Sequence, residues 1–332
     1  MVKKSFLFLS ILAISFAQQK FTTSGVGAGG NMAIQLDVAY SSVVTGVGAF
    51  AAAPYYCAQG SEVTSKTACM LSSYLINVDA LVQYTKDMAS LDNIDDVHNI
   101  AQDNIWLFSG SLDTEVHQDT VKKTQQYFSN FVNAYKINST FDVAAENSWV
   151  TNGYGNPCWY LGAPYLSNCQ YDAAGYILKQ LYGTLNAPVT MNFSNFYTFD
   201  QSEFVSSFDS GMVTYGWIYQ PWSCLYNPNC KVHVALHGCD MNYGAIGNAF
   251  VRNSGLNTWA ESNSIVIIYP QVLAQQVVNP AGCWDWWGYT GADYAWKSGP
   301  QMLGIYNITQ NIDLITSHYR PNLSAKINKT GN

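Results

Sequence analysis

The stretch Ser24-Gly25-Val26-Gly27-Ala28-Gly29-Gly30-Asn31-Met32-Ala33 lies between a short β-prone run, residues 21–24, and a segment with helical character, residues 32–40. It matches G-x-G-x-x-G, the dinucleotide-binding fingerprint, which alone is a weak signal. That fingerprint also needs an acidic residue about 20 positions later, and residues 45–54 contain none. Binding of a nicotinamide cofactor is therefore the weakest hypothesis for this turn. A phosphate-binding P-loop fails as well, because no Gly-Lys-Ser/Thr follows.

The nucleophile elbow, G-x-S-x-G, fits the same glycines better. In this motif a strand turns sharply into a helix and the middle residue points out above the sheet. Gly25 and Gly29 take the two glycine positions, and Gly27 stands where the serine would be. Ala28, the next residue, would offer its backbone N–H to an oxyanion. We therefore expect the functional site at this turn.

Strand-like and helix-like segments alternate along the rest of the chain. The expected strands are residues 43–52, 105–109, 231–236 and 265–269, and the expected helices are residues 80–87, 118–133 and 257–262. Such alternation predicts an α/β fold with a mostly parallel central sheet. No internal repeat or long linker interrupts it, so we predict a single domain over residues 18–332.

Composition limits the classes of partner. The 332 residues are 48% hydrophobic and only 11% charged, with 15 Lys+Arg against 22 Asp+Glu. The chain is too apolar to be disordered. Its net charge of −7 provides no basic surface for a phosphate backbone, so we expect no nucleic-acid binding. A surface of neutral polar groups suits a secreted protein that meets neutral polymers, sugars or esters.

The first 17 residues predict a secretory signal peptide. Lys3 and Lys4 precede an apolar run, residues 6–16, and Ser15-Phe16-Ala17 is a small-x-small cleavage site. No later segment has eighteen uninterrupted apolar residues, so we expect no membrane span. Five N-x-S/T sequons would be glycosylation sites if the source is eukaryotic. They begin at Asn138, Asn192, Asn307, Asn322 and Asn328.

Eight cysteines in a secreted chain indicate disulfides before they indicate a metal site. Their spacing favours local pairs, and we predict the pairs 57–69, 158–169, 224–230 and 239–283. No C-x-x-C motif pairs with a second one and no histidine cluster accompanies the cysteines, so we expect no zinc site and no cofactor.

Several long stretches, in one order, resemble the extracellular polyhydroxybutyrate depolymerase family. Besides the glycine-rich turn they are residues 48–50, 53–58, 108–113, 167–175, 236–239 and 282–289. The resemblance extends over almost all of the chain after the leader, to about residue 315. It implies a circularly permuted α/β-hydrolase. The motif order agrees, because the His-Gly oxyanion loop, which ordinarily precedes the elbow, comes late in this chain.

The resemblance also assigns site residues. Asp113 corresponds to the triad acid, although an aspartate in a turn often only bonds its own backbone. Asn147 falls at the position of the triad histidine, and an amide cannot take a proton at neutral pH. Ala28 and Cys239 would supply the two oxyanion N–H groups. Trp284 resembles a tryptophan that contacts substrate, or else belongs to a core beside the disulfide.

These residues lead to three hypotheses. The favoured one is a secreted, monomeric pseudoenzyme that binds polyester or a small ester in the old cleft, because Gly27 and Asn147 supply neither nucleophile nor base. The second is an active serine esterase that uses displaced groups, such as Ser24 or a serine from another loop. The third is a glycosylated structural or surface protein in which the fold serves only as a scaffold.

Overall fold

The computed structural model describes residues 18–318 apart from 206–209, 226 and 228. The predicted signal peptide, residues 1–17, and the sequons at Asn322 and Asn328 lie outside the described residues. Within the described ranges, no helix is long and apolar enough to cross a membrane.

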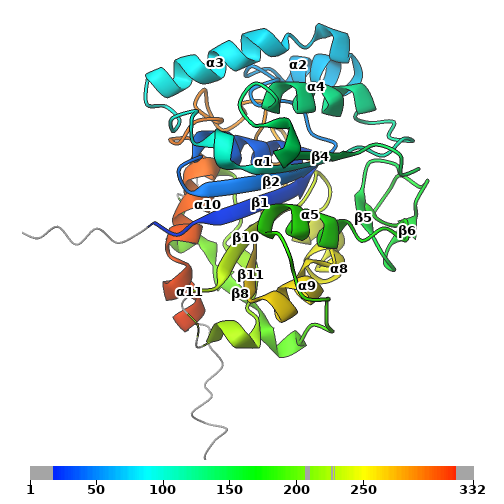
Figure 1. The fold of residues 1–332 in the computed structure, drawn as a ribbon, viewed down its shortest axis with the longest axis vertical. Coiled ribbons are helices and arrows are strands. Elements are labelled where there is room, and N and C mark those ends of the chain that lie inside the picture. Colours follow the sequence, from blue (N-terminus) through cyan, green and yellow to red (C-terminus); the bar gives the residue numbers. More distant parts are fainter. Residues whose placement is uncertain (1–17, 206–209, 226, 228, 319–332) are drawn as a thin grey trace, which may run out of the picture.

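The core of the molecule is an eight-stranded, mostly parallel sheet (Figure 1). In spatial order its strands are β4 (Ile137–Thr140), β3 (Asn104–Phe108), β2 (Val44–Phe50), β1 (Phe21–Val26), β10 (Lys231–Leu236), β11 (Ile265–Tyr269), β9 (Tyr215–Tyr219) and β8 (Phe196–Asp200). The pairs from β4 to β11 are parallel, and β9 and β8 add an antiparallel edge. The first strand in sequence therefore lies in the middle of the sheet.

The central strands are buried on both faces because helices cover both faces of the sheet. In β3, Ile105 and Leu107 belong to one hydrophobic cluster while Trp106 and Phe108 belong to the other. This alternation follows from the two-residue period of a strand.

The first cluster packs against α1 (Ala28–Ala39), α3 (Val78–Ser90), α4 (Gln118–Phe128) and α10 (Pro300–Gln310). The second packs against α5 (Ala173–Tyr182), α8 (Ala249–Asn253) and α9 (Leu256–Asn263). Figure 1 shows α3 and α4 on one side of the sheet and α5 and α9 on the other. Further α-helices in the described ranges are α2 (Glu62–Lys66), α7 (Tyr243–Ile246) and α11 (Ile312–His318), and η1 (Thr67–Leu71) is a π-helical turn. A small separate sheet has the order β5 (Trp149–Thr151), β7 (Leu166–Asn168), β6 (Asn156–Pro157).

The predicted α/β fold is confirmed, and two predicted strands, residues 231–236 and 265–269, have the observed bounds. Two helices differ from expectation by four residues or more at one end. α1 begins at Ala28, so that the glycines after the turn are helical. α4 ends at Phe128 because the next side chains, Ser129 and Asn130, bond back to the carbonyls of Gln125 and Gln126 and end the helix.

Four disulfides join the predicted pairs of cysteines, so that prediction is confirmed. They are Cys57–Cys69, Cys158–Cys169, Cys224–Cys230 and Cys239–Cys283. The last one connects the loop after β10 to a segment 44 residues later, and both of its ends lie beside the site described next.

Candidate functional site

The turn between β1 and α1 has the geometry of a nucleophile elbow. Gly27 has φ 56° and ψ −119°, a conformation that favours glycine. Two residues later, a Cβ on Gly29 would lie 2.3 Å from the carbonyl oxygen of His237, so only glycine allows α1 to approach the end of β10 this closely. The carboxyl ends of β1, β2, β3 and β10 open on the same edge of the sheet, which is where α/β proteins bind ligands.

The three residues assigned to the triad lie in one row beside this turn. Asn147 Nδ2 donates to Asp113 Oδ2 at 3.1 Å and to Asp113 Oδ1 at 3.3 Å. A Cβ on Gly27 would have Asn147 Oδ1 as its nearest neighbour, at 4.0 Å. Because an ionised carboxylate only accepts hydrogen bonds, the amide turns its nitrogen to Asp113 and its oxygen to Gly27.

Asp113 is held in place by its own loop. Its Oδ1 accepts hydrogen bonds from the backbone N–H groups of Val116 at 2.8 Å and Glu115 at 3.0 Å. Burial raises the pKa of Asp113 to about 6, although the bonds from Val116, Asn147 and Glu115 oppose that rise. Glu146 ties this loop to the Asn147 segment, because its carboxylate accepts from the backbone N–H of Thr114 at 3.0 Å.

The two residues assigned to the oxyanion hole, Ala28 and Cys239, both lie at this turn's pocket. Ala28 is the first residue of α1, so its N–H has no acceptor inside the helix and points from the positive end of the helix dipole. Cys239 follows β10 and lines the pocket together with Ala28. Asn31 braces the turn by donating to the Gly27 carbonyl at 3.0 Å and accepting from the Ala53 N–H at 2.9 Å.

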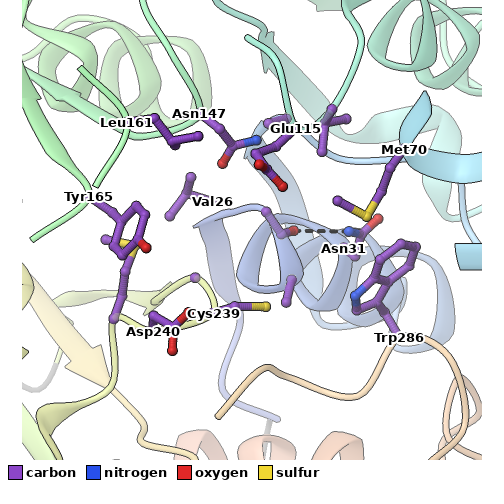
Figure 2. A pocket seen from close by; sticks show the side chains of 16 residues that line it. Val26, Asn31, Met70, Glu115, Asn147, Leu161, Tyr165, Cys239, Asp240 and Trp286 are labelled. Atoms are coloured by element: carbon purple, nitrogen blue, oxygen red, sulfur yellow. Dashed lines mark hydrogen bonds between the residues drawn. The ribbon is translucent and has the colours of Figure 1, made fainter. Parts of the chain in front are cut away.

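A pocket of about 250 Å³ is lined by Gly27, Ala28, Asn147 and Cys239 (Figure 2). Its apolar walls come from Val26, Met70, Leu161, Tyr165 and Trp286. A second cavity of about 510 Å³ shares Met70, Glu115, Cys239 and Trp286 with it, so the two form one cleft. In the described part of the chain, no group of three or more His, Cys, Asp or Glu side chains could hold a metal ion.

No family model matches the chain. Two curated proteins do. The chain is 41% identical over 318 residues to a poly(3-hydroxybutyrate) depolymerase of Delftia acidovorans, with 94% of this chain and 63% of that protein covered. It is 37% identical over 309 residues to a polyhydroxybutyrate depolymerase of Talaromyces funiculosus, with 88% of each covered. The chain belongs to the polyhydroxybutyrate depolymerase family. It spans about two thirds of the length of the Delftia relative.

Solved structures of the depolymerase family share the fold. The crystal structure of the enzyme from Penicillium funiculosum has a TM-score of 0.82 and 34% identity, with 91% of this chain and 97% of that one covered. A serine-to-alanine variant of a PHB depolymerase, complexed with an R3HB trimer, has a TM-score of 0.81 and 33% identity, with 92% and 100% covered. The central sheet is thus that of an α/β-hydrolase.

The tryptophans that line the cleft are Trp286 and, in the larger cavity, Trp287. Trp286 lines both cavities. Trp284, which was assigned a substrate contact, is fully buried, lines neither cavity and packs with its ring 5.5 Å from that of His237. Substrate contact by Trp284 stays a prediction, and its burial favours the alternative of a core beside the disulfide.

Ser24, the displaced nucleophile of the second hypothesis, is 0% exposed. Its Oγ lies 2.8 Å from His233 Nε2, and His233 Nδ1 lies 2.7 Å from Thr22 Oγ1. The imidazole is also fully buried, and burial lowers the pKa of His233 to about 3. This pair has a hydroxyl and a base, but neither side chain lines a cavity described above.

The other histidines whose side chains are described do not supply a base at the turn. His237 is buried and neutral, with Nδ1 donating to the Gly238 carbonyl at 2.8 Å and Nε2 accepting from the Val272 N–H at 3.3 Å. Burial lowers the pKa of His237 to about 4. His98 and His117 are exposed. No described histidine lines the pocket.

The sequence did not identify several residues of the cleft. Glu115 and Asp240 bring carboxylates to its walls, and Trp286 and Tyr165 bring aromatic rings. Glu115 lies two residues after Asp113 and Asp240 directly after Cys239, so closeness to the assigned residues was the available signal. No sequence signal pointed to Tyr165, because this residue reaches the cleft only through the fold of the loop closed by the Cys158–Cys169 disulfide.

Proposed function

We propose that this chain is a secreted member of the polyhydroxybutyrate depolymerase family that binds ester ligands in the cleft but does not hydrolyse them by the serine mechanism. One observation carries the proposal: the elbow bears Gly27, and the position facing it bears Asn147, whose amide is bonded to Asp113. Gly27 has no oxygen to attack a carbonyl, and an amide cannot accept the proton of a nucleophile.

The size of the resulting loss follows from serine hydrolases in general. Removing the nucleophile or the base costs on the order of 10⁶ in kcat, and the remaining site leaves about 10³ to 10⁴ over water. The two oxyanion N–H groups and the aromatic walls remain in this chain, and such groups bind an ester carbonyl without help from a nucleophile. The ligand class is supported by the R3HB trimer bound to a structural relative.

Secretion and topology belong to the same proposal. Four disulfides suit an oxidising compartment, in agreement with the predicted leader of residues 1–17. The elbow follows β1, the first strand in sequence, which supports a circularly permuted single domain over residues 18–332. We expect the protein to act as a monomer without a cofactor.

The test assays the purified protein on a chromogenic short-chain ester and on polymer film, with the Talaromyces relative as the active control. We expect no turnover above background, no covalent labelling by an organophosphonate, and saturable binding of the R3HB trimer by calorimetry. Turnover near that of the relative, or a labelled serine, would establish the second hypothesis instead. Absence of trimer binding together with absence of turnover would favour the scaffold.

A further inference from the structure

The walls of the pocket carry negative charge and no positive charge. Glu115 and Asp240 both line it, and no Lys, Arg or His of the described chain does. Figure 2 shows Glu115 beside Asn147 on one side of the pocket, and Asp240 with Cys239 on the opposite side. A ligand in the pocket therefore lies between two carboxylates.

The space above Gly27 is also bordered by a hydrogen-bond acceptor. Asp113 holds Asn147 by its nitrogen, so Asn147 Oδ1 faces the space above Gly27. The donors assigned to that point are the N–H groups of the lining residues Ala28 and Cys239, which together would hold one oxygen. A carbonyl oxygen satisfies them. A carboxylate would place its second oxygen, and its charge, against Asn147 Oδ1 and the two acidic side chains.

The neighbouring cavity does not compensate for this charge. Lys66 is the cation among its described lining residues, and its Nζ lies 2.6 Å from Glu62 Oε1. Glu62 and Glu115 line the same cavity. The positive end of α1 attracts an anion at the oxyanion site, but a helix dipole is a partial charge and acts only within the first turn. The full negative charges of Glu115 and Asp240 on the walls of the pocket oppose it.

We infer that the cleft selects esterified, uncharged ligands, such as the interior of a polyester chain or an end whose carboxyl group is blocked, and rejects free carboxylate ends. This inference rests on the proposed function, because it assumes that an ester ligand occupies the cleft. Such selectivity would let the protein bind intact ester chains in the presence of hydrolysis products, because hydroxy acids and acid-ended oligomers would compete poorly for the cleft.

The experiment compares one ligand in two forms. Calorimetry at pH 8 measures binding of the linear trimer of (R)-3-hydroxybutyrate as its methyl ester and as its free acid, at low salt and at high salt. We expect the free acid to bind at least tenfold more weakly at low salt, and the difference to shrink at high salt because salt screens charge. The variant Glu115→Gln/Asp240→Asn keeps both shapes and should strengthen binding of the acid about tenfold relative to binding of the ester.

The matched control is Glu203→Gln/Asp87→Asn, which changes the net charge equally at two exposed residues that line neither cavity. It should leave the preference for the ester unchanged. Equal binding of acid and ester to the unmodified protein overturns this inference but leaves the proposed function standing. Loss of the preference in the control variant also overturns it, because the effect would then come from overall charge. If neither form binds, both proposals fail.

Discussion

Ser24 and Gly27 lie three residues apart, the first on strand β1 and the second in the turn that follows it. A serine hydrolase needs a nucleophile, a base and an open pocket at one position, whereas here the hydroxyl and the imidazole are at Ser24 and the pocket is at Gly27. Ser24 has a hydroxyl and an imidazole at 2.8 Å, but both are sealed between β1, β10 and α5. Gly27 borders a cavity that Ala28 and Cys239 also line, but its neighbour is the amide of Asn147, which is bonded to the Asp113 carboxylate. Contact between a nucleophile and a base is therefore not sufficient to make a catalytic site. Access and a prepared electrostatic environment are equally required.

The largest effect we predict comes from restoring the missing groups at the open turn. The double variant Gly27→Ser/Asn147→His should gain at least about 10³-fold in hydrolysis of a chromogenic short-chain ester, because the oxyanion groups and Asp113 are already in position. Each single variant should stay near background, since nucleophile and base act as a unit. Initial rates of the purified proteins measure this.

A matched control for the double variant is Gly60→Ser/Asn147→His. Gly60 also has a positive φ, of 75°, and open space around it. This control should remain inactive. A double variant that folds, binds the ester and still shows no activity would mean that the row of residues at 27, 147 and 113 lacks the geometry we assign to it.

The second prediction concerns the buried pair of Ser24 and His233. His233→Ala should lower the free energy of unfolding by about 3 kcal/mol at pH 7.5, because it empties a buried volume and leaves hydroxyl groups without their partner. It should leave binding of the trimer unchanged. Urea unfolding with the disulfides intact measures the stability, and the exposed His98→Ala is the control.

The pH dependence of this variant has a defined sign. The folded pKa of His233, about 3, lies below the ordinary value of 6.5, so the unfolded chain binds a proton first as the pH falls. The stability that the neutral imidazole contributes is present above pH 6.5 and is lost toward pH 3. The gap between His233→Ala and the unmodified protein should therefore narrow by about 2 to 3 kcal/mol at pH 4.5. A constant gap would contradict a buried neutral imidazole.

The third prediction concerns Asp113. An active triad needs this carboxylate, but in this protein it lowers the free energy of unfolding. Its folded pKa of about 6 lies above its ordinary value of 3.8, so keeping it ionised above pH 6 opposes folding. Asp113→Asn should raise the free energy of unfolding by about 2 kcal/mol at pH 8. The gain should vanish near pH 4, where the carboxyl group is protonated in the folded state.

Urea titrations at the two pH values measure this effect, and Asp142→Asn, at an exposed aspartate, serves as the control. The amide at position 113 can still accept from the N–H groups of Glu115 and Val116. A loss of stability at pH 8 would instead point to a cationic partner for Asp113, as in an active triad.

The smallest predicted effect separates the two tryptophans. Trp286→Ala should weaken binding of the trimer methyl ester about tenfold, because it removes an aromatic wall shared by both cavities. Trp284→Phe should leave that affinity unchanged, since Trp284 is fully buried. The reverse result, measured by calorimetry, would restore Trp284 as the residue that contacts the ligand.

Local patterns in the sequence were sufficient for the fold class. The glycine-rich turn predicted a strand-to-helix elbow because close approach of α1 to β10 excludes any side chain at Gly29. Cysteine spacing favoured three of the four disulfides, since short loops bring their ends together at low entropic cost, and the fourth predicted pair, Cys239–Cys283, spans 44 residues. The edge strands β8 and β9 were missed. They pair in antiparallel fashion beside β11, and nothing local in their sequence indicates that partner.

The sequence alone determined which side chains are available at the elbow: Gly27 brings none, Asn147 brings an amide, and Asp113 brings a carboxylate. Only the tertiary structure decided how they are arranged. The order of parallel strands brings the ends of β1, β3 and β10 to one edge of the sheet, places Asn147 against Asp113 and puts Trp286 into the cleft while Trp284 stays inside. The same packing turned Ser24 toward His233 and away from solvent. The physical reason is that chemical identity is local, whereas access, orientation and the surrounding charge depend on segments more than a hundred residues apart.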